Sequence, residues 1–87
     1  MAVVPVPRAW LRRKTSVEQA EVDHEIKGVP FGARADQWQA LKAQMRPGDE
    51  IWEFESGGAS WEAWAGRAGV SLVRGGMAVA SVLTAMN

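Results

Sequence analysis

The alternation of apolar and polar residues in the carboxyl-terminal half of the chain predicts β-structure. One run alternates strictly, and two further apolar runs are joined by Gly75 and Gly76. Glycines adopt the positive φ angles of a tight hairpin turn, so the last two runs are expected to pair. The pattern therefore predicts a small antiparallel sheet with three main strands, at residues 50–55, 69–74 and 77–84.

Both faces of the predicted hairpin are largely apolar. Trp52 and Phe54 share one face of the first strand, and we expect that face to meet the helices. A sheet covered on both sides needs two layers, and a chain this short readily supplies one. The small, uncharged face of the hairpin is therefore expected to form a homo-oligomer interface, made by Val73, Ala78, Ala80 and Val82.

Apolar spacing in the amino-terminal half predicts two helices, at about 16–27 and 36–46, on one face of the sheet. In the second helix, large apolar residues recur at helical spacing, namely Trp38, Leu41 and Met45. The first segment is ambiguous, because its second half also alternates as a strand would. With a helix at that segment, the fold class is α+β.

Residues 1–14 are interpreted as an extended arm, since Pro5 and Pro7 forbid a regular helix. Two alternatives stay open for this arm: it is flexible, or it lies along a partner. Its basic residues, Arg8 to Lys14, are interpreted as a solvated terminus. Residues 15–87 then form a single α+β domain.

Length and composition limit the function classes. The 87 residues include no cysteine, and small chains without disulfides often gain stability by oligomerising. Ten basic and ten acidic side chains balance, which makes nucleic acid an improbable partner. No apolar run reaches the roughly 20 residues of a membrane span, and no export signal stands out. We expect a cytoplasmic protein without a membrane partner.

Tryptophans and carboxylates gathered in the middle of the chain form the sharpest candidate site. Indole faces attract organic cations, and a neighbouring carboxylate would complete a cage around one. The competing interpretation is that the tryptophans fill the core while the glutamates face water, which is the commoner outcome for aromatic residues. The candidate ligand-binding residues are Trp38, Trp52, Glu53, Glu55, Trp61, Trp64 and Arg67.

An enzyme is the alternative. Glu53 and Glu55 share a strand face, at a separation suited to acid–base catalysis, with Arg67 as a partner at a subunit boundary. An exposed acidic strand is the commoner reason for such a pair. His24 is the single histidine and completes neither a catalytic triad nor a metal site. No catalytic residue, metal or cofactor is expected.

Several segments resemble a group of small uncharacterised bacterial proteins, found among mobile integron gene cassettes and on ordinary chromosomes. The resemblance covers roughly residues 15–87 and implies an accessory role, with no activity or functional residue to carry over. It rests on Pro30-Phe31-Gly32-Ala33-Arg34, Gln37-Trp38-Gln39-Ala40-Leu41, residues 47–54, Ser60-Trp61, residues 65–69, Leu72-Val73-Arg74 and residues 84–87.

Together these patterns predict a non-enzymatic homo-oligomer that works by binding. Its partner is either another protein or a small organic ligand held in a Trp-lined cleft. The alternative is the small enzyme built on Glu53 or Glu55 with Arg67.

Overall fold

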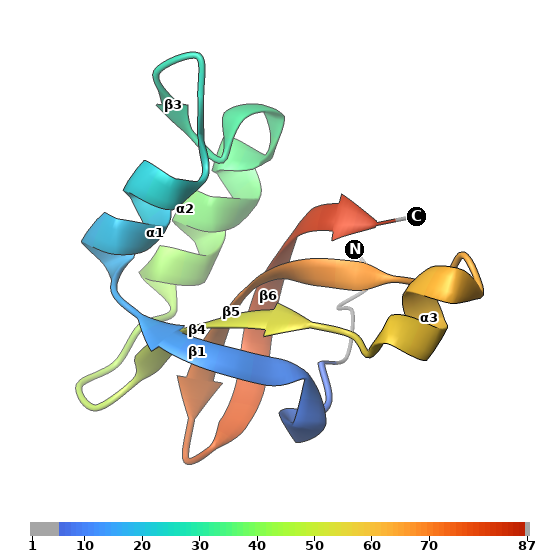
Figure 1. Ribbon diagram of the computed structural model, residues 1–87. Helices are drawn as coiled ribbons and strands as arrows, with labels where there is room; N and C mark the ends of the chain where they lie inside the picture. Colours follow the sequence, from blue (N-terminus) through green and yellow to red (C-terminus); the bar gives the residue numbers. More distant parts are fainter. Residues whose placement is uncertain (1–5, 87) are drawn as a thin grey trace.

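The computed structural model describes residues 6–86, which form a four-stranded antiparallel sheet, a small two-stranded sheet and several helices (Figure 1). The strand order of the main sheet is β1-β4-β5-β6, and β2 pairs with β3. The elements, in chain order, are η1 (Arg8–Trp10), β1 (Leu11–Thr15), α1 (Val17–Asp23), β2 (Glu25–Ile26), β3 (Val29–Pro30), η2 (Gly32–Arg34), α2 (Ala35–Ala43), β4 (Glu50–Glu55), α3 (Gly58–Glu62), β5 (Arg67–Arg74) and β6 (Met77–Met86).

The predicted α+β class is confirmed, and the main sheet has four strands rather than three. The extra strand is β1, which pairs with β4 and includes residues of the predicted arm. Its sequence, Leu-Arg-Arg-Lys-Thr, lacks the apolar alternation that marks a strand, because both of its faces are largely wet. Within residues 6–86, no helix has the length and apolarity needed to cross a membrane.

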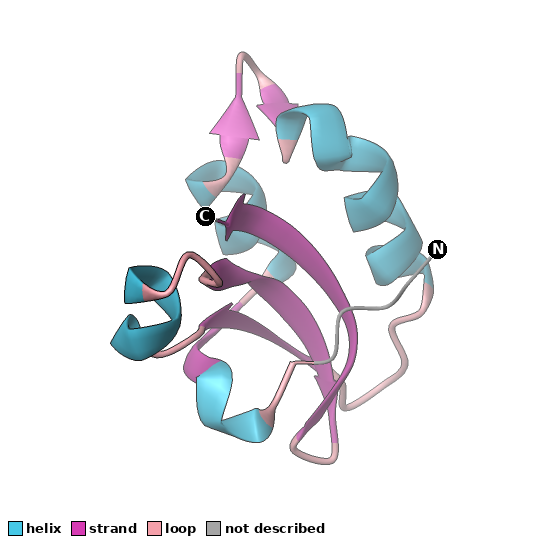
Figure 2. Ribbon diagram, turned by 90° about the vertical axis from the view of Figure 1, so that its right-hand side faces the viewer, coloured by secondary structure: helices cyan, strands magenta, loops and turns pink. Residues whose placement is uncertain are grey.

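The main core joins α1 and α2 to the sheet. Figure 2 shows the strands as curved ribbons, with α3 and η1 lying away from α1 and α2. Full burial of a large apolar side chain contributes roughly 1.5–3 kcal/mol to the free energy of folding. The core cluster therefore holds the layer of α1 and α2 on the main sheet. Its buried members are Ala20, Phe31, Trp38, Leu41, Ile51, Val70, Leu72 and Val82.

The helix-facing side of β4 is opposite to the predicted one. Ile51 belongs to the core beneath the helices, whereas Phe54 is buried on the other face of the strand. There Trp10 of η1 stacks on Phe54, with 6.4 Å between the ring centroids. The segment predicted as an arm therefore covers part of the second face of the sheet. Residues 1–5 of that predicted arm lie outside the described residues.

The register of the β5–β6 hairpin also differs from the prediction. Val73 pairs with Ala78, but the next pair is Leu72 with Ala80, which leaves Val79 as an inserted residue. Each residue inserted into one strand sends the following side chains to the other face. Ala80 and Val82 therefore face the helices.

The four residues expected at a subunit interface consequently do not form one exposed face. Val82 is 0% exposed and lies in the helix-facing core, and Ala80 packs against the same core. Val73 is buried as well, and Ala78 keeps partial exposure. The bulge at Val79 is the physical reason that Ala80 and Val82 leave the predicted face, and the alternation of residues does not reveal a bulge.

A glycine at the second irregularity of the hairpin provides a test of this packing. A Cβ at Gly69 would lie 2.0 Å from the backbone oxygen of Val82. That oxygen cannot move away unless the pairing of β5 with β6 is disturbed. We expect Gly69→Ala to lower the free energy of unfolding by about 1–3 kcal/mol in urea denaturation. The control, Gly58→Ala, has open space around the new methyl group. Equal stability of the two variants would contradict the observed register.

An ion pair fastens the hairpin turn to the end of α2. The guanidinium of Arg74 donates to both carboxylate oxygens of Asp49, at 3.0 and 2.8 Å, and to the backbone oxygen of Gln44 at 3.1 Å. The backbone N–H of Arg46 also donates to Asp49. These contacts, led by the Arg74 hydrogen bond, hold the pKa of the Asp49 carboxyl below its ordinary value.

This pair predicts a pH dependence of stability. Because the pKa of Asp49 is lower in the folded state, the unfolded chain binds more protons at acidic pH, and stability is lost as pH falls through the folded pKa. We expect Asp49→Asn to be less stable at neutral pH and to lose less stability below about pH 4. Glu62→Gln, at an exposed position of α3, is the control. If stability falls as steeply with decreasing pH in Asp49→Asn as in the unmodified protein, the lowered pKa of Asp49 is not the cause of the pH dependence.

Candidate functional site

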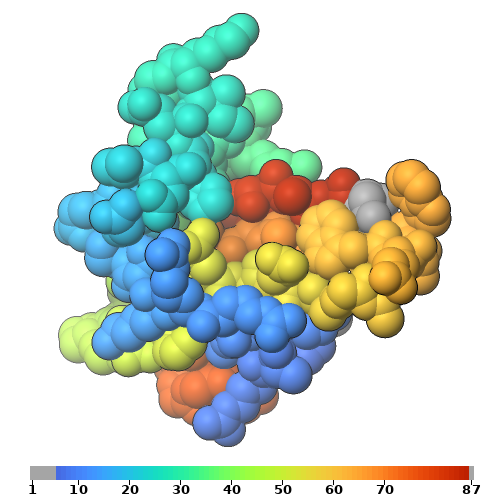
Figure 3. Space-filling model, in the orientation of Figure 1, coloured from blue at the N-terminus to red at the C-terminus, as the bar shows by residue number. Residues whose placement is uncertain are grey.

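Two adjoining hollows lie where the end of α1 approaches the sheet. The hairpin hollow, about 260 Å³, is bounded by the end of α1, the β2–β3 hairpin and η2. The sheet hollow, about 280 Å³, opens over β1, β4 and β5. His24 and Thr84 line both. Figure 3 shows the face on which the end of α1 meets β4 and the end of β6.

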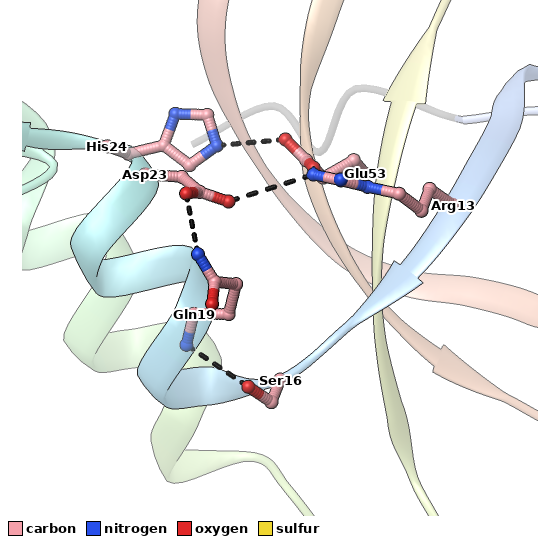
Figure 4. Close-up of polar contacts among 6 residues, drawn as sticks. All are labelled: Arg13, Ser16, Gln19, Asp23, His24 and Glu53. Carbon is pink, nitrogen blue, oxygen red and sulfur yellow. Dashed lines mark hydrogen bonds and ion pairs between the residues drawn. The ribbon is translucent and has the colours of Figure 1, made fainter.

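A polar cluster stands between the two hollows (Figure 4). His24 Nε2 lies 3.2 Å from Glu53 Oε1, and the Arg13 guanidinium donates to the other oxygen of that carboxylate. Arg13 also lies 3.7 Å from Asp23. The cluster thus joins β1, β4 and the end of α1, and it neutralises a carboxylate that points to the helix side of the sheet.

Local chain geometry explains how these groups meet. Ser16 ends the turn after β1 and caps α1, its hydroxyl accepting from the Gln19 backbone N–H at 3.1 Å. The Gln19 side chain donates to Asp23 at 2.8 Å, which fixes the last turn of the helix. His24 follows directly and closes the helix with its N–H on the Ala20 carbonyl.

Two rings that line the hairpin hollow, His24 and Phe31, belong to a stack of three that ends in the core at Trp38. His24 lies over Phe31 at 5.0 Å and Phe31 lies over Trp38 at 4.4 Å, measured between ring centroids. Phe31 has φ 63°, in the left-handed region that bulky residues rarely adopt, at a cost of roughly 1–3 kcal/mol. Its buried ring and a hydrogen bond from its N–H to the His24 carbonyl hold that conformation.

Two charged groups near the stack have shifted pKa values. Hydrogen bonding and charge from Glu53 raise the pKa of the Arg13 guanidinium above its ordinary value. Hydrogen bonds from Lys42 and Trp38 lower the pKa of Glu21. Glu21 receives the indole N–H of Trp38 at 2.8 Å and the Lys42 ammonium at 2.7 Å, so the buried indole is satisfied.

The tryptophans predicted to line a ligand cleft lie in three parts of the fold: the core, β4, and α3 with the turn that follows it. Trp38 is fully buried in the core. Trp52 donates to Glu50 at 2.9 Å, on the strand face opposite the helices. The Trp61 ring lies against Gly66, and Trp64 is 80% exposed. These indoles do not form a shared cage.

The two predicted glutamates lie together, and the predicted arginine lies apart from them. Glu53 and Glu55 both line the sheet hollow, next to Arg12 and Arg13. Arg67 does not line it, and its guanidinium donates to the Gly66 carbonyl at 2.8 Å. Within one protomer, Arg13 therefore occupies the place expected for Arg67.

Sequence reasoning missed most of the residues gathered here. The sequence pattern predicts Arg13 in a solvated terminus and gives His24 no part in a triad or a metal site. The one available signal is a histidine flanked by Asp23 and Glu25 at the end of a helix, and such a pattern is common on surfaces. Only the pairing of β1 with β4 brings Arg13 to Glu53.

The cluster does not offer a metal site. Among residues 6–86, no group of three or more histidine, cysteine, aspartate or glutamate side chains could hold a metal ion. The chemistry that the arrangement can perform is hydrogen bonding, charge pairing and proton transfer at His24 and Glu53.

No family model, curated protein or solved structure matches this chain. The resemblance to integron-cassette proteins therefore remains a prediction.

A double-mutant cycle tests the central ion pair. We expect Arg13→Gln and Glu53→Gln to show a favourable coupling free energy that shrinks in 1 M salt, where the screening length is about 3 Å. A matched cycle combines Arg13→Gln with Glu18→Gln, an exposed carboxylate on α1, and should show no coupling. Urea denaturation of the variants gives both values. A coupling that is absent, or insensitive to salt, would contradict the pair.

Proposed function

We propose that this protein is a non-enzymatic binding protein that works as a homo-oligomer, assembled through the free edge of β6. The observation that carries this proposal is the place of β6 in the sheet. It spans ten residues, Met77–Met86, and is paired with β5 alone. Its other side presents backbone N–H and C=O groups that, within residues 6–86, meet no further strand.

The two edges of the sheet differ in charge. The β1 edge carries three consecutive basic residues, Arg12, Arg13 and Lys14, which repel a like strand. The β6 edge contains no charged residue and no proline. Proteins usually protect a long edge with such residues, so an unprotected edge is typical of a strand that pairs with another.

A second copy is the partner that suits this edge best. Two identical uncharged strands pair antiparallel about a two-fold axis without bringing like charges together. The regular part of β6 lies between the bulges beside Val79 and Thr84, so pairing would centre on residues 80–83. The association would also cover apolar side chains that are exposed in one protomer: Met77 (69%), Val79 (38%) and Met86 (52%).

The binding part of the proposal rests on the hairpin and sheet hollows, which take the place of the expected Trp-lined cleft. They offer a small organic ligand both charged and aromatic walls. A protein partner is the other outcome. The lack of cysteine and the resemblance to bacterial cassette proteins support a cytoplasmic, accessory role.

Assembly is tested by light scattering coupled to size exclusion at micromolar concentration. We expect a mass above that of one chain, and a shift toward the single-chain mass in Val79→Lys, because a charge on the edge must be desolvated on pairing. Val22→Lys introduces the same charge at an exposed site on α1 and should leave the mass unchanged. A single-chain mass for the unmodified protein removes the assembly proposal.

Acid–base catalysis is the second candidate, favoured by the contact between His24 and Glu53 at the border of two hollows. Turnover of chromogenic esters and glycosides would be compared in the unmodified protein and in Glu53→Gln. Our proposal predicts no turnover by either. Activity that disappears in Glu53→Gln would favour the enzyme.

A further inference from the structure

Two opposite charges in the hairpin hollow are left without partners. Arg34, from η2, and Glu25, from β2, both line this hollow. Within residues 6–86, neither side chain forms an ion pair or a side-chain hydrogen bond, with the other or with any other residue. Arg34 is a partly buried residue and Glu25 is exposed. Both are therefore accessible to a ligand.

The remaining charges around the hollow are already engaged. Asp23 accepts from Gln19 and lies beside Arg13. Glu53 accepts from Arg13 and contacts His24. A ligand entering the hairpin hollow therefore finds one available cation and one available anion, at Arg34 and Glu25.

Besides the two available charges and Asp23, His24 and Thr84, the remaining residues of the wall are apolar. Ile26 and Ala33 line the opening, and the buried Phe31 ring forms the floor. The volume, about 260 Å³, is below the roughly 300–1,000 Å³ of pockets for drug-sized molecules, so the occupant must be small.

We propose that the hairpin hollow binds a small zwitterion with an apolar body, such as an aliphatic amino acid. Its carboxylate pairs with the fork of Arg34 donors, its ammonium pairs with Glu25, and its side chain lies against Ile26 and Ala33. A simple anion would leave Glu25 unpaired beside it, and a simple cation would leave Arg34 unpaired. The zwitterion satisfies both groups.

Leucine is a suitable probe, with two near-isosteric controls. Leucinamide lacks the carboxylate, and 4-methylpentanoate lacks the ammonium group. Binding would be followed through backbone amide chemical shifts of residues 23–34 and Thr84, at ligand concentrations up to about 10 mM. We expect leucine to bind at least tenfold more tightly than either control. Absent shifts, or a control that binds as tightly as leucine, would overturn the proposal.

Matched variants test whether Arg34 and Glu25 bind the two charged groups of leucine. Arg34→Gln and Glu25→Gln should each weaken leucine binding at least tenfold. Arg46→Gln and Glu18→Gln, exposed positions that line neither hollow, should leave it unchanged. Leucine affinity that is equal in Arg34→Gln and Arg46→Gln would also overturn the assignment. Amide spectra of each variant without ligand verify that it is folded.

Zwitterion binding rests on the proposed binding function of the hairpin hollow and not on the proposed assembly. The residues that would hold the zwitterion all lie on β2, η2 and the segment between them in one protomer. The Val79→Lys variant should therefore bind leucine with unchanged affinity whatever its mass. A loss of binding in that variant, while Val22→Lys still binds, would place the site at the subunit boundary and contradict the proposal.

Discussion

The rest of the structure depends on the way Trp38 is held. Its ring is fully buried, stacked on Phe31, and lies in one cluster with residues of three strands. Its indole N–H is satisfied by Glu21 of α1, and Lys42 binds the same carboxylate oxygen from the next turn of α2. One side chain thereby fixes α1 against α2 and both against the sheet. A small domain buries a limited fraction of its surface, so such a contact matters more than in a larger protein.

The candidate site lies at one end of this core. On β4, Ile51 is buried beneath the helices, while Glu53, two residues on and on the same face, reaches the polar border with His24 and Arg13. A carboxylate on a helix-facing position is costly unless it is paired, and the cluster supplies two partners. The left-handed Phe31 sits directly below, so strain and polarity coincide here. Such coincidence is typical of functional sites.

The two edges of the main sheet differ in charge. The β1 edge is basic, and its Arg13 serves the polar cluster, whereas the β6 edge is apolar and uncharged. The hairpin hollow is lined mainly by the end of α1, β2 and η2, and Thr84 is the residue of β6 that lines it. The small-molecule site proposed there uses residues of β2 and η2, which are separate from the β6 edge.

The α+β class, the span of β4, the hairpin around Gly75 and Gly76, and the helix that carries Trp38 all follow from the sequence pattern. These features depend on local periodicity and turn chemistry, which are properties of neighbouring residues. The face of β4 that meets the helices is set by long-range packing, because alternation shows which residues share a face and not which face is covered. The tertiary structure also decides the bulge at Val79 and the strand β1, whose charged residues carry no strand signal. The site belongs to this second group, since Arg13, His24 and Glu53 meet only after long-range strand pairing has placed them.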